Sequence, residues 1–336
     1  MKRFFLFSFL LLSPIAVQAA PSMQEMSLKV TEEFILPAYD DFAKQAHAQS
    51  ELWGETCDAE KLKPAFQKTS DAWAKVQHIN FGPITSLLRR DRLYHWPERR
   101  NSISKSINKS LADKDPASLD LDKFASTSVA LQGLPALERL LYSDGLLDGD
   151  FACKLGHTIA LNIEKIATGT DKDWQEALVN IKEGIAHPIY FESMDEVAIR
   201  FFTEMLAGFQ MITDQKIALP LSSSLKKANG KRAEGWRSNR STRYIQQNSL
   251  ALMAMAKPFM SFMPDDVEKQ VVAQFTVFAR AANALPLSIK DGVKDEEGRA
   301  KIKKFLDETR TTRNLLVQTF TKHLGLTVGF NSLDGD

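Results

Sequence analysis

Apolar residues recur every three or four positions along most of the chain, and this spacing places them on one face of an α-helix. One segment, 195–213, is apolar almost all the way round and predicts a helix buried at the centre of the fold. The one-sided pattern is clearest in segments 62–76, 267–285 and 302–324.

The same pattern predicts about ten helices separated by short connections, which is typical of up-and-down bundles. The only candidate for a strand is the short stretch 327–330. We therefore predict an all-α fold of two helical bundles packed together. Breaks between helices are expected near 52–59, Pro97, 113–119, 143–151, 168–173, Pro188, 218–224, Pro264 and 291–298.

The break expected at 168–173 lies near the middle of the chain and suggests a division into two bundles. The N-terminal bundle would cover residues 20–167 and the C-terminal bundle residues 168–336. The two halves show no obvious repeat, so one continuous domain remains an alternative.

The first nineteen residues have the pattern of a secretory signal peptide rather than of a folded element. Lys2 and Arg3 precede an apolar run at 4–12, and small residues at 17–19 predict cleavage after Ala19. The run is too short to span a bilayer, and no cysteine follows the cleavage point to carry a lipid. We expect a secreted protein, located in the periplasm, with no transmembrane segment in the mature chain.

Composition excludes several classes of protein. Of 336 residues, 44% are hydrophobic and 25% are charged, which is the composition of a globular protein rather than of a disordered one. The 43 basic residues are balanced by 42 acidic ones, so no overall field attracts nucleic acid, and we expect no such partner.

Cys57 and Cys153 are the only cysteines in the chain. In an oxidising compartment they are expected to form a disulfide. Closing a loop of about 100 residues would stabilise the fold by roughly 4–5 kcal/mol on the chain-entropy model. The alternative is two buried free thiols. Metal binding has less support, because neither cysteine has a histidine or second cysteine at ligand spacing.

Common catalytic signatures, including HExxH, GxSxG, the Walker loop and GxGxxG, are absent. Two segments with unusual chemistry stand out instead. In WAKVQHINFGP, an apolar helix ends at His78, which either caps that helix or belongs to a site. In YHWPERR, Trp96 and Arg99 crowd a helix start at Pro97, and the guanidinium of Arg99 suits a carboxylate or a phosphate.

In a third segment, QGLPALERLL, Gly133 and Pro135 interrupt a strong helical pattern and should kink or restart the helix at Pro135. Glu138 follows within one turn. A buried carboxylate needs a partner, and Arg99, Arg237 or Arg240 could provide it. A fourth segment, GWRSNRS, lies in a stretch at 226–243 that is rich in Lys, Arg, Gly and Asn and predicts a long, partly irregular loop.

Together these four segments, in this order, resemble the imelysin-like family, also called the M75 peptidase or iron-regulated protein A family. The resemblance extends over most of the mature chain. It implies a secreted or periplasmic all-helical protein of two bundles, in a family with links to iron uptake. It also implies a hallmark Gly-x-His-x-x-Glu on a kinked helix, whose His and Glu share one face and hold a metal.

This chain departs from the hallmark at its central position. Gly133 and Glu138 match, but Pro135 occupies the place of the histidine and cannot bind a metal. A zinc peptidase therefore has little support, and we expect no enzymatic activity. His78 could replace the lost ligand and bind iron or another divalent metal together with Glu138.

A role without metal is also open. His78, Arg99, Glu138, Trp236, Arg237 and Ser241, with Trp96 and Gly133 beside them, could line a pocket for a small anionic ligand. The same residues could instead form a polar network that locks the bundles together. The leading hypothesis is a non-enzymatic binding component related to iron or metal uptake, with a membrane-associated uptake partner. The alternative is a ligand- or partner-binding scaffold with no metal.

Overall fold

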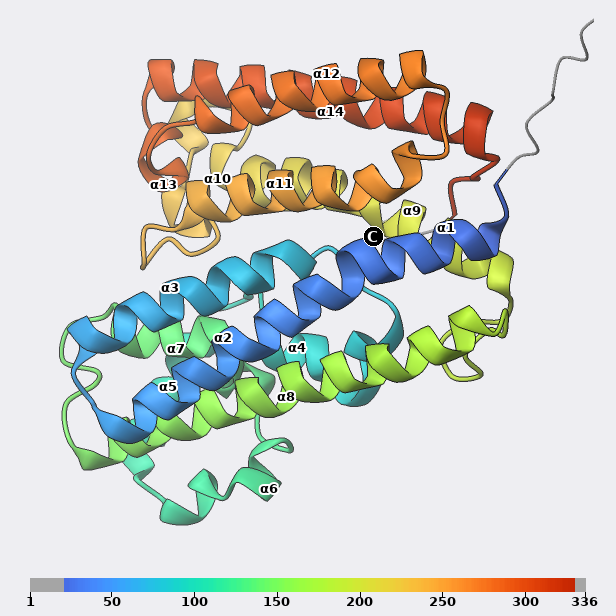
Figure 1. Ribbon diagram of the computed structural model, residues 1–336. Helices are drawn as coiled ribbons and strands as arrows, with labels where there is room; N and C mark the ends of the chain where they lie inside the picture. Colours follow the sequence, from blue (N-terminus) through green and yellow to red (C-terminus); the bar gives the residue numbers. More distant parts are fainter. Residues whose placement is uncertain (1–20, 330–336) are drawn as a thin grey trace, which may run out of the picture.

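The computed structural model describes residues 21–329, and this part of the chain is all-α with no β-strand (Figure 1). The predicted fold class is confirmed. Residues 327–329, from the stretch named as the only candidate for a strand, have no regular structure. The predicted signal peptide lies outside the described residues. The helices are α1 Met23–Val30, α2 Leu36–Glu55, α3 Ala59–Val76, α4 Arg89–Leu93, α5 Ser102–Asp113, α6 Leu121–Phe124, α7 Gly133–Leu141, α8 Asp150–Lys182, α9 Met194–Gln210, α10 Ala218–Leu221, α11 Ser241–Met260, α12 Asp265–Asn283, α13 Ile289–Gly292 and α14 Glu296–Leu324.

Two bundles lie one above the other in Figure 1. The lower bundle is built on α2, α3, α7 and α8, and the upper bundle on α11, α12 and α14. A π-helical turn, Thr31–Ile35, joins α1 to α2, and another, Met211–Ile217, joins α9 to α10. The bundles meet where α3 packs on α11 and α1 packs on α9.

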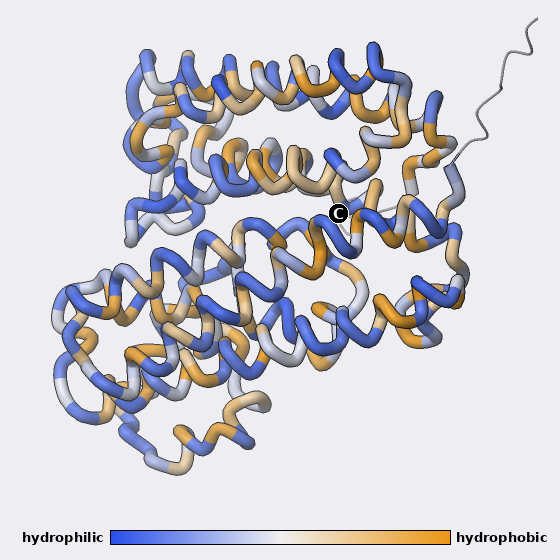
Figure 2. The backbone as a smooth tube through the Cα atoms, in the orientation of Figure 1, coloured by the Kyte–Doolittle hydropathy of each residue, from blue (hydrophilic) through white to orange (hydrophobic). Residues whose placement is uncertain are grey.

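Local sequence signals explain where the long helices begin. The carboxylate of Asp58 accepts a hydrogen bond from the Glu60 N–H at the start of α3, and Asp295 caps α14 through the Gly298 N–H. Ser193 does the same for α9. The helices between these caps carry mixed hydrophobic and hydrophilic positions, as the colouring of Figure 2 shows.

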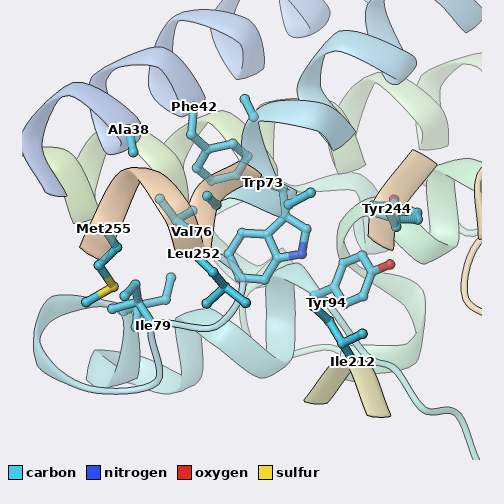
Figure 3. Packing of buried hydrophobic residues seen from close by; sticks show 14 of the residues in the cluster. Ala38, Phe42, Trp73, Val76, Ile79, Tyr94, Ile212, Tyr244, Leu252 and Met255 are labelled. Atoms are coloured by element: carbon cyan, nitrogen blue, oxygen red, sulfur yellow. The ribbon is translucent and has the colours of Figure 1, made fainter. Parts of the chain in front are cut away.

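A continuous hydrophobic core crosses the boundary between the bundles. Trp73 of α3 packs on Phe42 of α2, with ring centroids 5.7 Å apart, and on Tyr94, at 5.6 Å. Tyr94 in turn meets Tyr244 of α11 at 6.1 Å, while Leu252 of α11 lies in the same cluster (Figure 3). Burial of these large side chains stabilises the packing of one bundle against the other.

The helix break expected at 168–173 is wrong, because α8 runs without interruption from Asp150 to Lys182. A boundary between residues 167 and 168 would cut this helix. The chain crosses to the upper bundle after α8 (Figure 1), and we propose the connection 183–193 as the division between the bundles.

Cys57 and Cys153 form the predicted disulfide, with their Cα atoms 5.6 Å apart. The bond joins the segment before α3 to the start of α8 and closes a loop that contains α3 to α7. Among residues 21–329, no helix combines the length and apolar character needed to cross a bilayer.

The long loop predicted at 226–243 corresponds to residues 222–240, which contain only two short 3₁₀ turns before α11 begins at Ser241. Its path is held by neighbours. The Asn229 N–H donates to the carbonyl oxygen of Pro220, and a Cβ atom at Gly230 would lie 2.0 Å from the carbonyl oxygen of Lys290. This close approach requires glycine at position 230 and places the loop directly against α13.

Candidate functional site

A cavity of about 440 Å³ opens where three of the unusual segments meet. One wall is the loop between α4 and α5, the floor is the start of α7, and the opposite wall is the 222–240 loop. Of the residues singled out in the sequence, those that line this cavity are Trp96, Arg99, Glu138, Trp236 and Arg237. The remaining three, His78, Gly133 and Ser241, lie outside its lining.

The floor of the cavity is formed by the first turns of α7. The helix begins at Gly133, so the predicted restart occurs two residues before Pro135, which is the third residue of the helix and lines the cavity. Gly133 has φ +76°, and a Cβ atom there would lie 2.1 Å from the carbonyl oxygen of Leu93. Its function is to let the α7 start pass close to the end of α4.

Glu138 is 6% exposed and projects from the floor. Its Oε1 atom accepts hydrogen bonds from the Ser238 N–H at 2.9 Å and the Ser238 hydroxyl at 2.6 Å. Burial raises the pKa of Glu138, while Ser238 and the charges of Arg237 and Arg240 oppose that rise. The direct partner is therefore Ser238, inside the GWRSNRS segment, whereas the sequence analysis considered only arginines.

Arg237 is tied to the opposite wall. Its guanidinium lies 3.6 Å from the Glu98 carboxylate and donates to the Ser104 hydroxyl at 3.2 Å. It also stacks on the Trp236 indole at 4.5 Å, and two further cations, Lys231 at 5.7 Å and Lys290 at 5.8 Å, lie over the same ring. Neither lysine carries a motif signal in the sequence, although Lys231 lies in the loop predicted at 226–243.

The helix start predicted at Pro97 is wrong. Residues 94–101 are irregular, and α5 begins at Ser102. The reason is that Arg100 and Asn101 have left-handed backbone, with φ of 57° and 56°, and Glu98 accepts the Ile103 N–H at 3.0 Å. Glu98 thereby satisfies a free donor at the start of α5, and Arg99 stays exposed at the cavity wall.

His78 lies in the turn after α3, where it is 3% exposed. Its Nε2 atom lies 3.1 Å from the Met255 sulfur, and its ring is 5.9 Å from the Phe34 ring. Burial, with a smaller effect from Lys216, lowers the pKa of His78 to about 3, so the ring is neutral. No described contact joins His78 to Glu138, so the structure does not bring the two predicted metal ligands together.

Ser241 is the first residue of α11 and is buried. Its hydroxyl accepts the Ile289 N–H at 3.2 Å and so helps to hold α13 beside the loop. This contact supports the cavity wall without lining it.

A second polar cluster, which we call the buried network, consists of Gln77, Tyr94, Lys216 and Glu234. Lys216 and Glu234 form a salt bridge in which each side chain is 1% exposed. Gln77 accepts from Lys216 at 2.7 Å and donates to Glu234 at 2.6 Å, and the Tyr94 hydroxyl donates to Glu234 at 2.7 Å. Burial lowers the pKa of Lys216, and the Glu234 charge opposes that effect.

The buried network connects the two halves of the chain. Gln77 and Tyr94 directly follow α3 and α4, whereas Lys216 lies in the π-helical turn Met211–Ile217 and Glu234 in the 222–240 loop, both after the connection 183–193. The network set out above as an alternative to the pocket would use the pocket's own residues, whereas the buried network contains none of them. Sequence reasoning missed Lys216 and Glu234, since neither carries a spacing signal.

The donor set of the cavity does not fit a resident metal ion. Glu138 is the only hallmark residue there with a ligating atom, one of its oxygens is engaged by Ser238, and cations surround it. Within residues 21–329, no cluster of three or more His, Cys, Asp and Glu side chains is arranged to hold a metal.

Comparison with known proteins places the chain in a family. The imelysin (peptidase M75) family model matches residues 35–316. An imelysin-like protein from Psychrobacter arcticum has a similar fold, with TM-score 0.74 and 18% identity over 94% of this chain and 100% of that one. A protein assigned as an iron-regulated protein A precursor from Parabacteroides distasonis gives TM-score 0.67 and 17% identity over 92% and 98%. No curated protein matches in sequence.

Proposed function

The chain belongs to the imelysin family, and on that premise we propose that it is a non-enzymatic binding component related to iron or metal uptake in the periplasm. The observation that carries the proposal is the cavity between the loop that holds Trp96 and the 222–240 loop. Its volume of about 440 Å³ is that of a small-ligand site, and aromatic and charged side chains converge on it.

The chemistry of the walls favours a metal carried as an anionic chelate over a bare ion. A free cation would meet Glu138 together with the positive charges of Arg99, Lys231 and Arg237. A chelate presents carboxylate or similar groups outward, and arginine forks bind such groups well. The iron context comes from the family and from the name of the Parabacteroides distasonis structure.

The second candidate is a scaffold that binds a ligand or partner protein and involves no metal. The same cations favour it, since they attract an anion whether or not the anion carries a metal. A peptidase has less support, because Pro135 replaces the motif histidine and leaves Glu138 without a second ligand beside it. In either case we propose that a membrane-associated uptake partner receives the bound cargo.

The test is iron retention by the mature protein, prepared without a His-tag. The protein is dialysed against ferric ion as its citrate complex and, separately, against ferrous ion alone, and bound iron is measured by atomic absorption. We expect about one iron per chain from the citrate complex. Arg99→Gln should reduce this, because it removes one of the exposed cations that line the cavity and pair with an anionic chelate.

The matched control is Arg310→Gln, at an exposed site on α14 outside the cavity. Retention that is equal in the control and wild type but reduced in Arg99→Gln supports the proposal. Absence of retained iron in both forms would overturn the role in iron binding.

A further inference from the structure

We propose that the cavity recognises an organic polycarboxylate, bound through the cations that surround Trp236, whether or not a metal accompanies it. The location rests on the proposed function, but the recognition chemistry does not depend on iron. We call the side chains of Lys231, Trp236, Arg237 and Lys290 the cation cluster.

The first step is the convergence of charge. Lys231, Arg237 and Lys290 all lie within 4.5–5.8 Å of the Trp236 ring centroid. Lys290 comes from α13, while the others belong to the 222–240 loop, so two separate segments bring their charges to one indole. Three positive charges around one ring repel each other, and a bound anion would reduce that repulsion.

The second step is the shortage of acidic partners. Among the described residues, the cation cluster has one ion pair, between Arg237 and Glu98. Glu98 is already occupied as an acceptor at the start of α5. Of the cluster, Lys231, Trp236 and Arg237 line the cavity, whereas Lys290 lies over the Trp236 ring outside the lining. Arg99 and Arg232 also line the cavity and have no described acidic partner. The lining therefore keeps an excess of positive charge over its two carboxylates, Glu98 and Glu138. The excess makes an anion the expected ligand.

The third step is shape. Trp96, Ile103 and Pro135 give the cavity apolar wall area that a bare inorganic anion does not contact. A volume of about 440 Å³ also exceeds what one phosphate or sulfate fills. A carbon skeleton with two or three carboxylates satisfies both the apolar walls and the separated cations, and guanidinium and ammonium groups both pair with carboxylate.

The experiment uses the mature protein and isothermal titration with tricarballylate, a metal-free tricarboxylate, with sulfate as the inorganic comparison. We expect wild type to bind tricarballylate more tightly than sulfate, with an affinity that falls as salt is raised. Lys231→Met/Lys290→Met should weaken tricarballylate binding about 10- to 100-fold, as expected for the loss of charge-assisted contacts.

The matched control is Lys303→Met/Lys322→Met, which removes the same charge from exposed positions on α14. Tricarballylate affinity that is equal in wild type and Lys231→Met/Lys290→Met overturns the inference. Ferric citrate retention, measured in parallel, separates the two proposals. Retention that does not depend on the lysines leaves the proposed function standing alone, whereas tricarballylate binding without any iron retention leaves this inference standing alone.

Discussion

The buried network and the cation cluster share the 222–240 loop, yet their charges are arranged in opposite ways. Glu234 of the network precedes Trp236 of the cluster by two residues. In the network, Lys216 and Glu234 are fully buried and pair directly. At the cavity wall, Lys231 is exposed and has no described acidic partner.

The difference in burial gives the two clusters different roles: the buried network stabilises the fold, and the cation cluster is available to a ligand. A buried charge must be paired inside the protein, because desolvation is costly, so the network serves the joint between the bundles. A partly exposed cation needs no partner within the protein, because water solvates it until an external anion binds. The network positions the 222–240 loop, and Lys231 and Lys290 of the cluster offer charges without a described acidic partner.

The largest effect is expected from breaking the network. Lys216→Met leaves the Glu234 carboxylate buried without its cation and should lower the free energy of unfolding by about 3–5 kcal/mol. Chemical denaturation at pH 7 measures this. Lys216→Met/Glu234→Gln should recover part of the loss, because the uncompensated charge is gone. A single-variant loss below about 1 kcal/mol would contradict a role for the pair in joining the bundles.

A smaller effect is expected at Glu204 of α9, a third buried charged site, where the Asn80 N–H donates to the carboxyl at 3.3 Å. Burial raises the pKa of Glu204 to about 7, although Arg200 and Arg90 oppose the rise. The folded state therefore binds more protons than the unfolded state between the ordinary glutamate pKa of 4.5 and about 7. The contribution of Glu204 to the free energy of unfolding is therefore fully present below pH 4.5 and is lost as the pH rises to about 7.

Glu204→Gln should remove this dependence and make the protein more stable than wild type at pH 8, by on the order of 2–3 kcal/mol. Unfolding free energies at pH 5 and pH 8 provide the comparison. Glu176→Gln, on the exposed face of α8, is the matched control and should leave the pH profile as in wild type. Equal pH profiles for Glu204→Gln and wild type would show that Glu204 is already ionised at low cost.

The smallest effect on stability is expected at the cation cluster itself. Lys231→Met/Lys290→Met should change the free energy of unfolding by less than about 1 kcal/mol, because these charges have no described acidic partner to lose. The same denaturation experiment used for Lys216 tests it. A loss above about 2 kcal/mol would mean that the lysines hold the fold, and the contrast between the two regions would fail.

Much of the fold was predictable from local pattern. The apolar spacing at 267–285 and 302–324 corresponds to α12 and α14, and the two cysteines could pair only with each other. The helix break predicted at 168–173 is wrong because tertiary packing outweighs the weak helix propensity of these residues. Gly169 lets the Arg89 guanidinium approach, and the Thr170 hydroxyl donates to the Ile166 carbonyl, so these residues suit a packed helix.

The candidate site was predictable in part. Trp96, Glu138, Trp236 and Arg237 carry motif signals and do line one cavity. His78 carries an equal signal but is buried against Met255, because the turn after α3 directs it into the core. Nothing in the spacing of a polar residue reveals whether its side chain points to the cavity or to the core.

The sequence alone determined the helical class, the disulfide and the loss of the motif histidine at Pro135, because periodicity, cysteine count and residue identity are local properties. Only the tertiary structure decided which charges meet. Lys216 and Glu234 pair, while Lys231 and Lys290 gather on Trp236, because two bundles and three loops place residues from distant parts of the chain side by side. The free energy of a charge depends on burial and on neighbours, and the packed chain sets both.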